Sequence, residues 1–178
     1  FEIHAFSFGP DTEDEMTLRI KKGVDHFHDV RKMSNKDAAM LARSLEIDIA
    51  VDLGGFTSNS KTEIFAMSAA PIQISYIGYP GTMGASYYDY LVADEILIPE
   101  KNQKYYTEKI AYLPNYQVND SKQSLPEVVF SRQDLGLPKT GFVFCCFSNT
   151  FKLTPATFDG WGRILKQVDN SVLLIYAD

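Results

Sequence analysis

The order of apolar and polar residues along the chain predicts short strands that alternate with helices. Strands are expected at residues 1–7, 26–30, 47–53, 72–77, 90–94 and 109–113. Helical spacing of apolar residues after Ser34, a candidate N-cap, predicts a helix, and two further helices are expected at 13–22 and 62–67. Brief, continuously apolar strands between helices are typical of a parallel sheet that helices cover on both sides. The pattern therefore predicts an α/β fold.

A second unit of the same kind follows a polar, proline-punctuated stretch. A strand at 142–147, a helix from Pro155 to about Val168 and a strand at 171–176 form one βαβ pattern. We divide the chain into a first lobe at residues 1–114, a connecting segment at 115–139 and the truncated start of a second lobe at 140–178. Because strand-like segments stand at both ends of the chain, we expect it to be part of a longer protein.

Three loops with unusual chemistry follow predicted strands, at residues 52–57, 78–84 and 148–154. In open α/β sheets, ligands bind beyond the carboxyl ends of the strands, where such loops gather. The middle loop holds three glycines and a proline, which allow the backbone to approach a ligand closely, and neighbouring tyrosines offer flat surfaces and hydroxyls to a sugar or a ring. A tight structural turn packed by aromatic residues is the alternative, and composition alone favours it.

The third loop has the features of a phosphate site. Thr154 and Pro155 are typical of the N-cap and the first position of a helix, whose free N–H groups favour an anion. Lys152 stands two residues before the cap, and Asn149 adds a side-chain amide donor. A capped surface helix with an exposed lysine fits the same spacing equally well.

Other kinds of site find little support. His26 and His28 flank Phe27, but no third ligand stands at metal-site spacing, so we expect no metal. There is no Walker motif, GxGxxG motif or Ser-His-Asp order, so the sequence does not indicate a P-loop kinase, dinucleotide enzyme or hydrolase.

The net charge and the cysteines bear on the protein's binding partners and its compartment. The net charge is −6 and the 17 basic residues are scattered, which argues against binding nucleic acid or an anionic membrane surface. The sequence shows no membrane span and no signal peptide. Cys145 and Cys146 are neighbours on a predicted strand, so they point to opposite faces and we interpret them as small buried core residues without a disulfide. Unpaired thiols predict a cytoplasmic protein.

Two long segments resemble the catalytic region of the protein O-GlcNAc transferases, also called the SPINDLY-like family. They are "APIQISYIGYPGTMGASYYDYLVAD" with "EKIAYLP" downstream, and "FCCFSNTFKLTPATFDGWGRIL" followed by "NSVLLIY". The resemblance extends over nearly the whole chain. It implies two Rossmann-like lobes in the GT-B arrangement, of which the chain holds most of the first and the first βαβ unit of the second. The implied reaction transfers GlcNAc from UDP-GlcNAc to Ser or Thr hydroxyls of an acceptor protein, with inversion and without a metal or other cofactor.

The resemblance also implies roles for particular residues. Ile77, Gly78 and Pro80 are expected to lie against the sugar on the first lobe. Lys152 is expected to contact the pyrophosphate and to stabilise the leaving group. Asn149, where many relatives have Gln, is expected to contact the pyrophosphate beside it.

Several family features are absent from this chain. These are the Asp-Phe-Gly-Asn-His stretch with its catalytic histidine, the downstream segments that hold uridine, and the tetratricopeptide repeats that recruit acceptor proteins. Gly54 stands where many relatives have Asn, and Phe151 where some have Tyr. We therefore expect the chain to be inactive by itself. The sequence leaves open a UDP-glucose or UDP-galactose enzyme that glycosylates asparagine, another sugar-nucleotide enzyme of the same fold, and a non-catalytic α/β binding module.

Overall fold

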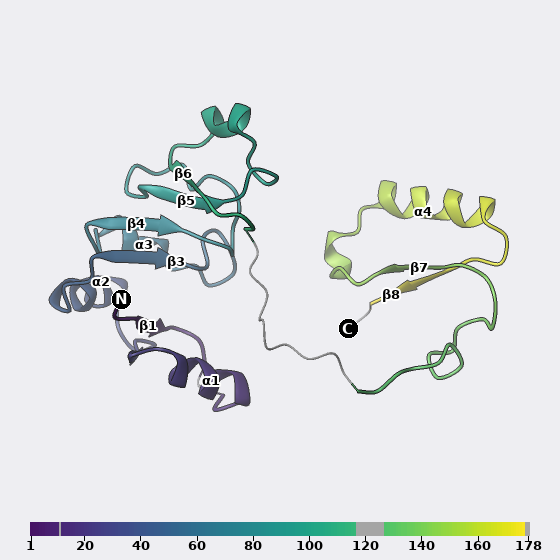
Figure 1. Ribbon diagram of the computed structural model, residues 1–178, viewed down its shortest axis with the longest axis horizontal. Coiled ribbons are helices and arrows are strands. Elements are labelled where there is room, and N and C mark those ends of the chain that lie inside the picture. The colour runs from purple at the N-terminus through teal and green to yellow at the C-terminus, as the bar shows by residue number, and fades with distance from the viewer. Residues whose placement is uncertain (11, 117–126, 177–178) are drawn as a thin grey trace. The chain divides into compact units, whose positions relative to one another are not determined.

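The computed structural model of the chain describes residues 1–10, 12–116 and 127–176. The chain divides into two compact units, Phe1–Asp120 and Ser121–Asp178 (Figure 1). The predicted connecting segment at 115–139 includes residues 117–126, which lie outside the described residues, so the predicted domain limits remain predictions.

Unit 1 alternates strands and helices as the sequence predicts. Its elements are β1 (His4–Ser7), α1 (Glu15–Gly23), β2 (His26–Asp29), α2 (Asn35–Ser44), β3 (Ile49–Asp52), α3 (Thr62–Ala66), β4 (Ile72–Ser75), β5 (Tyr90–Ala93), the 3₁₀ helix η1 (Glu100–Tyr105) and β6 (Lys109–Tyr112). The prediction of a parallel α/β fold is confirmed, since every strand pair in the described chain is parallel. The strands are shorter than expected because regular pairing stops before the apolar runs end.

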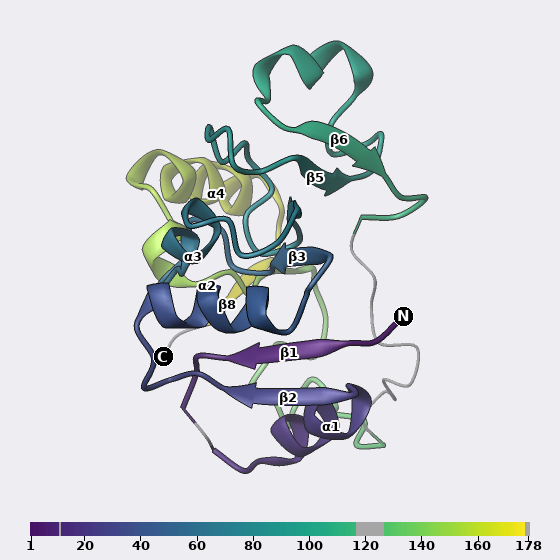
Figure 2. The same ribbon diagram turned by 90° about the vertical axis from the view of Figure 1, so that its left-hand side faces the viewer.

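The strands of unit 1 form two sheets. Strands β3, β4, β5 and β6 pair in chain order in a four-stranded sheet, and β1 pairs with β2 in a sheet of their own. Figure 2 shows β1 and β2 running side by side in the same direction. In the larger sheet Asp52, the last residue of β3, stands opposite Ser75, the last residue of β4. The loops that follow these two strands therefore start from the same edge.

Helix α2 closes the core of unit 1. Its start is readable in the sequence, since the Ser34 side chain caps it by accepting a hydrogen bond from Asp37 N. Its buried face consists of alanines, and the residues that form the core with it include Ile64 and Phe65 of α3 and Tyr88. The small side chains of α2 leave room for the larger side chains of its neighbours, so the helix packs closely against them. This packing holds the segment that leads into β3 in place.

Unit 2 contains one βαβ unit, as predicted. Its elements are β7 (Val143–Cys146), the 3₁₀ helix η2 (Thr150–Lys152), α4 (Pro155–Gln167) and β8 (Val172–Ile175), and β7 pairs with β8 in parallel. The interpretation of both cysteines as buried core residues is wrong for Cys145, which is exposed, while Cys146 is half-buried. A sheet of two strands with one helix leaves part of its surface uncovered, and on β7 it is Cys145 that is exposed. Among the described residues, no helix combines the length and the apolar character needed to cross a bilayer.

Candidate functional site

The loop after β4 contains a strained turn at the position where the resemblance implies sugar contacts. Gly78 N donates a hydrogen bond to Tyr76 O over 2.9 Å, two residues back, and Ile77 between them has a φ of +64°. A β-branched residue rarely adopts this left-handed conformation, and holding it there costs roughly 1–3 kcal/mol. The surrounding structure must impose the turn. Backbone strain of this kind clusters at functional sites.

Two glycines allow the loops after β3 and β4 to touch. A Cβ added to Gly78 would overlap Leu53 O and lie 2.8 Å from Gly54 O. A Cβ added to Gly55, whose φ is +57°, would lie 2.6 Å from the Tyr79 Cβ. Both distances are shorter than real Cβ contacts. The backbones of the two loops therefore meet at a distance that only glycine permits, which fixes the shape of the strained turn.

Asp52 anchors the first of these loops from inside the core. One carboxylate oxygen accepts hydrogen bonds from Gly54 N and Gly55 N at 2.9 and 3.0 Å, and the other accepts one from the Tyr88 hydroxyl at 2.5 Å. Burial, together with the hydrogen bond to Asp52, raises the pKa of Tyr88 above its usual value. The phenol therefore remains a hydrogen-bond donor at neutral pH. Asp52 was predicted only as the first residue of the loop at 52–57, and neither side chain was predicted to have this anchoring role.

A second buried carboxylate fixes the far end of the β4 loop. Glu108, which is 5% exposed, accepts hydrogen bonds from Met83 N and from the Thr82 hydroxyl, both at 2.7 Å. The Thr82 oxygen in turn accepts a hydrogen bond from Gly84 N at 3.0 Å. Charge-assisted hydrogen bonds of this kind are about twice as strong as neutral ones. The loop is thus held at both ends and in the middle, which is the rigidity that a preformed binding surface needs.

The predicted sugar contacts lie together on the exposed part of this loop. Gly78 and Pro80 are exposed and Ile77 is half-buried. Beside them the exposed Phe56 ring meets the Tyr79 ring edge-on, with the ring centroids 5.4 Å apart. A rigid backbone, a proline ring and an aromatic edge form a surface that suits a hexose ring.

The predicted phosphate contacts lie together in unit 2. Helix α4 begins at Pro155, and the Thr154 side chain accepts a hydrogen bond from Thr157 N at 3.2 Å. The prediction of a capped helix after a polar loop is confirmed. Lys152 is exposed, as is Asn149, whose backbone oxygen accepts a hydrogen bond from Lys152 N at 3.0 Å. This bond belongs to η2, a turn that the sequence did not predict and that sets Lys152 two residues before the helix cap.

The Lys152 ammonium also lies near an aromatic face. Its Nζ is 5.8 Å from the centre of the exposed Phe151 ring. A contact of this kind stabilises a cation by roughly 0.5–1 kcal/mol at an exposed site. The lysine therefore keeps its charge close to the loop and remains accessible to an anion. Its role in binding phosphate stays a prediction.

Comparison with known proteins identifies the family. The model of the family described as "Glycosyl transferase family 41" matches residues 1–130 and 121–177. The chain belongs to glycosyl transferase family 41. It is 40% identical over 97% of its length to the Arabidopsis thaliana protein described as "Probable UDP-N-acetylglucosamine--peptide N-acetylglucosaminyltransferase SEC", and it covers 18% of that protein. A protein described as "UDP-N-acetylglucosamine--peptide N-acetylglucosaminyltransferase" from Caenorhabditis elegans is 32% identical over 69% of the chain, which covers 11% of it.

A solved structure shares the fold of this family 41 chain. It is that of an O-GlcNAc transferase from Thermobaculum terrenum carrying the K341M substitution, with a TM-score of 0.82 and 27% sequence identity over 98% of the chain and 32% of that structure. The parallel α/β fold predicted from the sequence is therefore confirmed by similarity as well as by topology. The chain spans less than a fifth of the length of the curated relatives cited above.

Proposed function

We propose that this family 41 chain is part of an inverting glycosyltransferase that transfers GlcNAc from UDP-GlcNAc to Ser or Thr hydroxyls of proteins. Support comes from relatives whose names state this donor and a peptide acceptor. The single structural observation that carries the proposal is the strained, glycine-locked turn at Ile77 and Gly78, because it presents a rigid surface where the family motif is expected to meet the sugar. The catalytic histidine and the uridine-binding segments are assigned to other parts of the parent protein, so the chain alone is inactive.

Unit 1 supplies the contacts to the hexose in this proposal. Ile77, Gly78 and Pro80 lie against the sugar ring, and the buried carboxylates of Asp52 and Glu108 keep the loop in place without touching the donor. A loop that is already rigid loses little conformational entropy when the sugar binds. Shielding the anomeric carbon from water also favours the protein acceptor over hydrolysis.

Unit 2 supplies the contacts to the leaving group. The acceptor hydroxyl oxygen forms a bond to the anomeric carbon while the bond from that carbon to the β-phosphate oxygen breaks. The electron pair leaves with UDP, and the hydroxyl proton passes to a base outside this chain. Lys152, the Asn149 amide and the free N–H groups of the first turn of α4 face the negative charge that develops on the diphosphate. Such groups stabilise the transition state more than the ground state, so the displacement needs no metal ion.

The proposal extends to the parent protein. The parent has two Rossmann-like lobes in the GT-B arrangement and tetratricopeptide repeats that recruit acceptor proteins. Its partners are a UDP-sugar and a protein, not nucleic acid or membrane. We place it in the cytoplasm, in keeping with the free thiols of Cys145 and Cys146.

The test is a transfer assay with the full-length parent protein. UDP-GlcNAc, UDP-glucose and UDP-galactose, each labelled in the sugar, are supplied with an acceptor extract, and the labelled protein is treated with alkali. We expect label from UDP-GlcNAc alone, released by β-elimination from Ser or Thr. Transfer from UDP-glucose to an alkali-stable asparagine linkage contradicts the proposal. UDP binding without any labelled protein contradicts it as well.

A further inference from the structure

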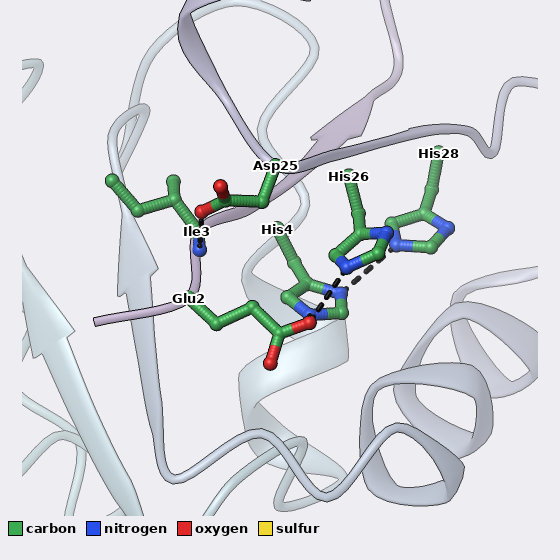
Figure 3. Close-up of polar contacts among 6 residues, drawn as sticks. All are labelled: Glu2, Ile3, His4, Asp25, His26 and His28. Atoms are coloured by element: carbon green, nitrogen blue, oxygen red, sulfur yellow. Dashed lines mark hydrogen bonds and ion pairs between the residues drawn. The ribbon is translucent and has the colours of Figure 1, made fainter.

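The three histidines of the chain, His4, His26 and His28, come together on β1 and β2. His4 stands opposite His26 in the parallel register, and His28 lies two residues further along β2, on the same face. Glu2 lies beside them, just before β1 (Figure 3). Sequence spacing showed only the pair on β2, because His4 lies on β1 and Glu2 just before it, and the pairing of β1 with β2 brings them to that pair.

The geometry of Glu2, His4 and His26 suits one metal ion. Glu2 Oε1 lies 2.6 Å from His26 Nε2 and 3.5 Å from His4 Nε2, and one ligand atom from each residue lies within 4.8 Å of the other two. In a tetrahedral zinc site with ligand bonds of about 2.0–2.1 Å, neighbouring ligand atoms are roughly 3.3 Å apart. Small side-chain adjustments reach that spacing. Two imidazoles and one carboxylate also form a donor set that zinc uses in proteins.

His28 completes the arrangement by orienting one of the ligands. Its Nε2 lies 3.1 Å from His4 Nδ1, and the two rings are stacked with centroids 5.3 Å apart. The separation of these two nitrogens suits a hydrogen bond from one ring to the other. With the Nδ1–H of His4 donated to His28, the Nε2 of His4 is free to bind a metal ion. Metal-ligating histidines commonly have such a partner on their other nitrogen.

The site has a structural use that is separate from sugar transfer. It lies where β1 and β2 begin, whereas the loops of the candidate sugar site follow the carboxyl ends of β3 and β4. Strands β1 and β2 form a two-stranded sheet, and two-stranded sheets gain little stability from their own pairing. A metal ion whose ligands come from the β1 segment and from β2 joins the two strands at the point where their hydrogen bonding begins.

We propose that Glu2, His4 and His26 bind a zinc ion that clamps β1 to β2. The ion has three protein ligands, with water in the fourth position, and His28 positions the His4 ring. The site stabilises unit 1 and takes no part in the chemistry of the transferase.

The experiment uses the 178-residue chain without a histidine tag, freed of metal with a chelator. Zn²⁺ binding is measured by calorimetry, Co²⁺ is used as a probe of ligand geometry by visible absorption, and the melting temperature is recorded with and without Zn²⁺. We expect one ion per chain, the strong absorption of tetrahedral Co²⁺, and a higher melting temperature with Zn²⁺. His26→Gln should abolish all three effects. His28→Phe should weaken binding by roughly 10-fold or more.

Matched variants separate this site from other sources of binding. Glu2 is an exposed side chain, so Glu2→Gln leaves the fold intact and should weaken Zn²⁺ binding, whereas Glu95→Gln, another exposed carboxylate of unit 1, should not. The double variant Cys145→Ser/Cys146→Ser should bind Zn²⁺ as tightly as the unsubstituted 178-residue chain does. Circular dichroism of the metal-free variants checks that each is folded. The proposal is overturned if the unsubstituted 178-residue chain binds no Zn²⁺, if Zn²⁺ binding survives His26→Gln, or if only the cysteine variant loses Zn²⁺ binding.

Discussion

The substitution Gly78→Ala tests whether the touching loops of β3 and β4 are structurally essential. The added Cβ would overlap Leu53 O and lie 2.8 Å from Gly54 O, whereas ordinary contacts begin near 3.4 Å. Both obstructing atoms belong to the backbone, so one of the loops has to move by more than half an ångström. Overpacking of this kind costs about 1–3 kcal/mol. For a unit of this size, each kcal/mol lowers the melting temperature by about 4 °C, so a decrease of roughly 4–12 °C is expected.

The matched control is Gly54→Ala in the neighbouring loop. There a Cβ would lie 3.5 Å from Asp52 Oδ1 and 3.6 Å from Thr57 Oγ1, which are ordinary contacts. We expect its free energy of unfolding to lie within about 0.5 kcal/mol of the parent chain. Urea unfolding and thermal melting of both variants give the comparison. If Gly78→Ala is as stable as Gly54→Ala, the two loops are not locked together and the argument for a preformed sugar surface fails.

Three further predictions concern side chains that stabilise each of the two units by itself. Tyr88→Phe removes the hydroxyl that donates a hydrogen bond to the buried carboxylate of Asp52. It should lower the free energy of unfolding, measured in urea titrations, by about 1.5–3 kcal/mol. The control Tyr87→Phe should change that free energy by less than about 0.5 kcal/mol. Backbone N–H donors, first that of Leu97, hold the pKa of Asp94 below its usual value. The ionised Asp94 therefore stabilises the fold above the unfolded pKa of about 3.9, and this stabilisation is lost as the pH falls through the lower folded pKa. Unfolding measured below about pH 4 should therefore show a weaker acid dependence in Asp94→Asn, and an unchanged dependence would contradict the assignment. Thr154→Ala removes the N-cap of α4 and should destabilise unit 2 by about 1 kcal/mol, whereas Thr154→Ser should keep most of the stability. The unfolding of both variants can be followed by the fluorescence of the single tryptophan, which lies in that helix.

Features that depend on neighbouring residues were predictable from the sequence. The helix starts at Ser34 and Thr154 could be predicted because a cap is made by a side chain and a backbone N–H three residues away. The strands could be predicted because a parallel sheet buries continuous apolar runs, although the ends of the runs overstate the length of regular pairing. The glycine-rich loop after β4 was predicted to be tightly shaped, and this shape is confirmed, while its role in binding a sugar stays a prediction.

Features that depend on distant partners were not predictable. Asp52 and Tyr88 are 36 residues apart in sequence, and no local pattern connects them. The left-handed Ile77 opposes its own conformational preference, which only the surrounding structure overcomes. The exposure of Cys145 follows from the number of strands in its sheet, which the apolar run does not reveal. The histidine cluster arises from the register of two parallel strands.

The most direct test of the proposed function is the turnover of the full-length parent carrying Lys152→Ala. Loss of one charged donor to a developing anion lowers kcat by roughly 10²–10³-fold, and the KM for UDP-GlcNAc should change much less, because the lysine acts mainly in the transition state. Lys166→Ala, an exposed lysine in the last turn of the same helix α4, should leave both constants unchanged. A Lys152→Ala enzyme with the kcat of the parent would show that this lysine does not stabilise the leaving group and would contradict the account.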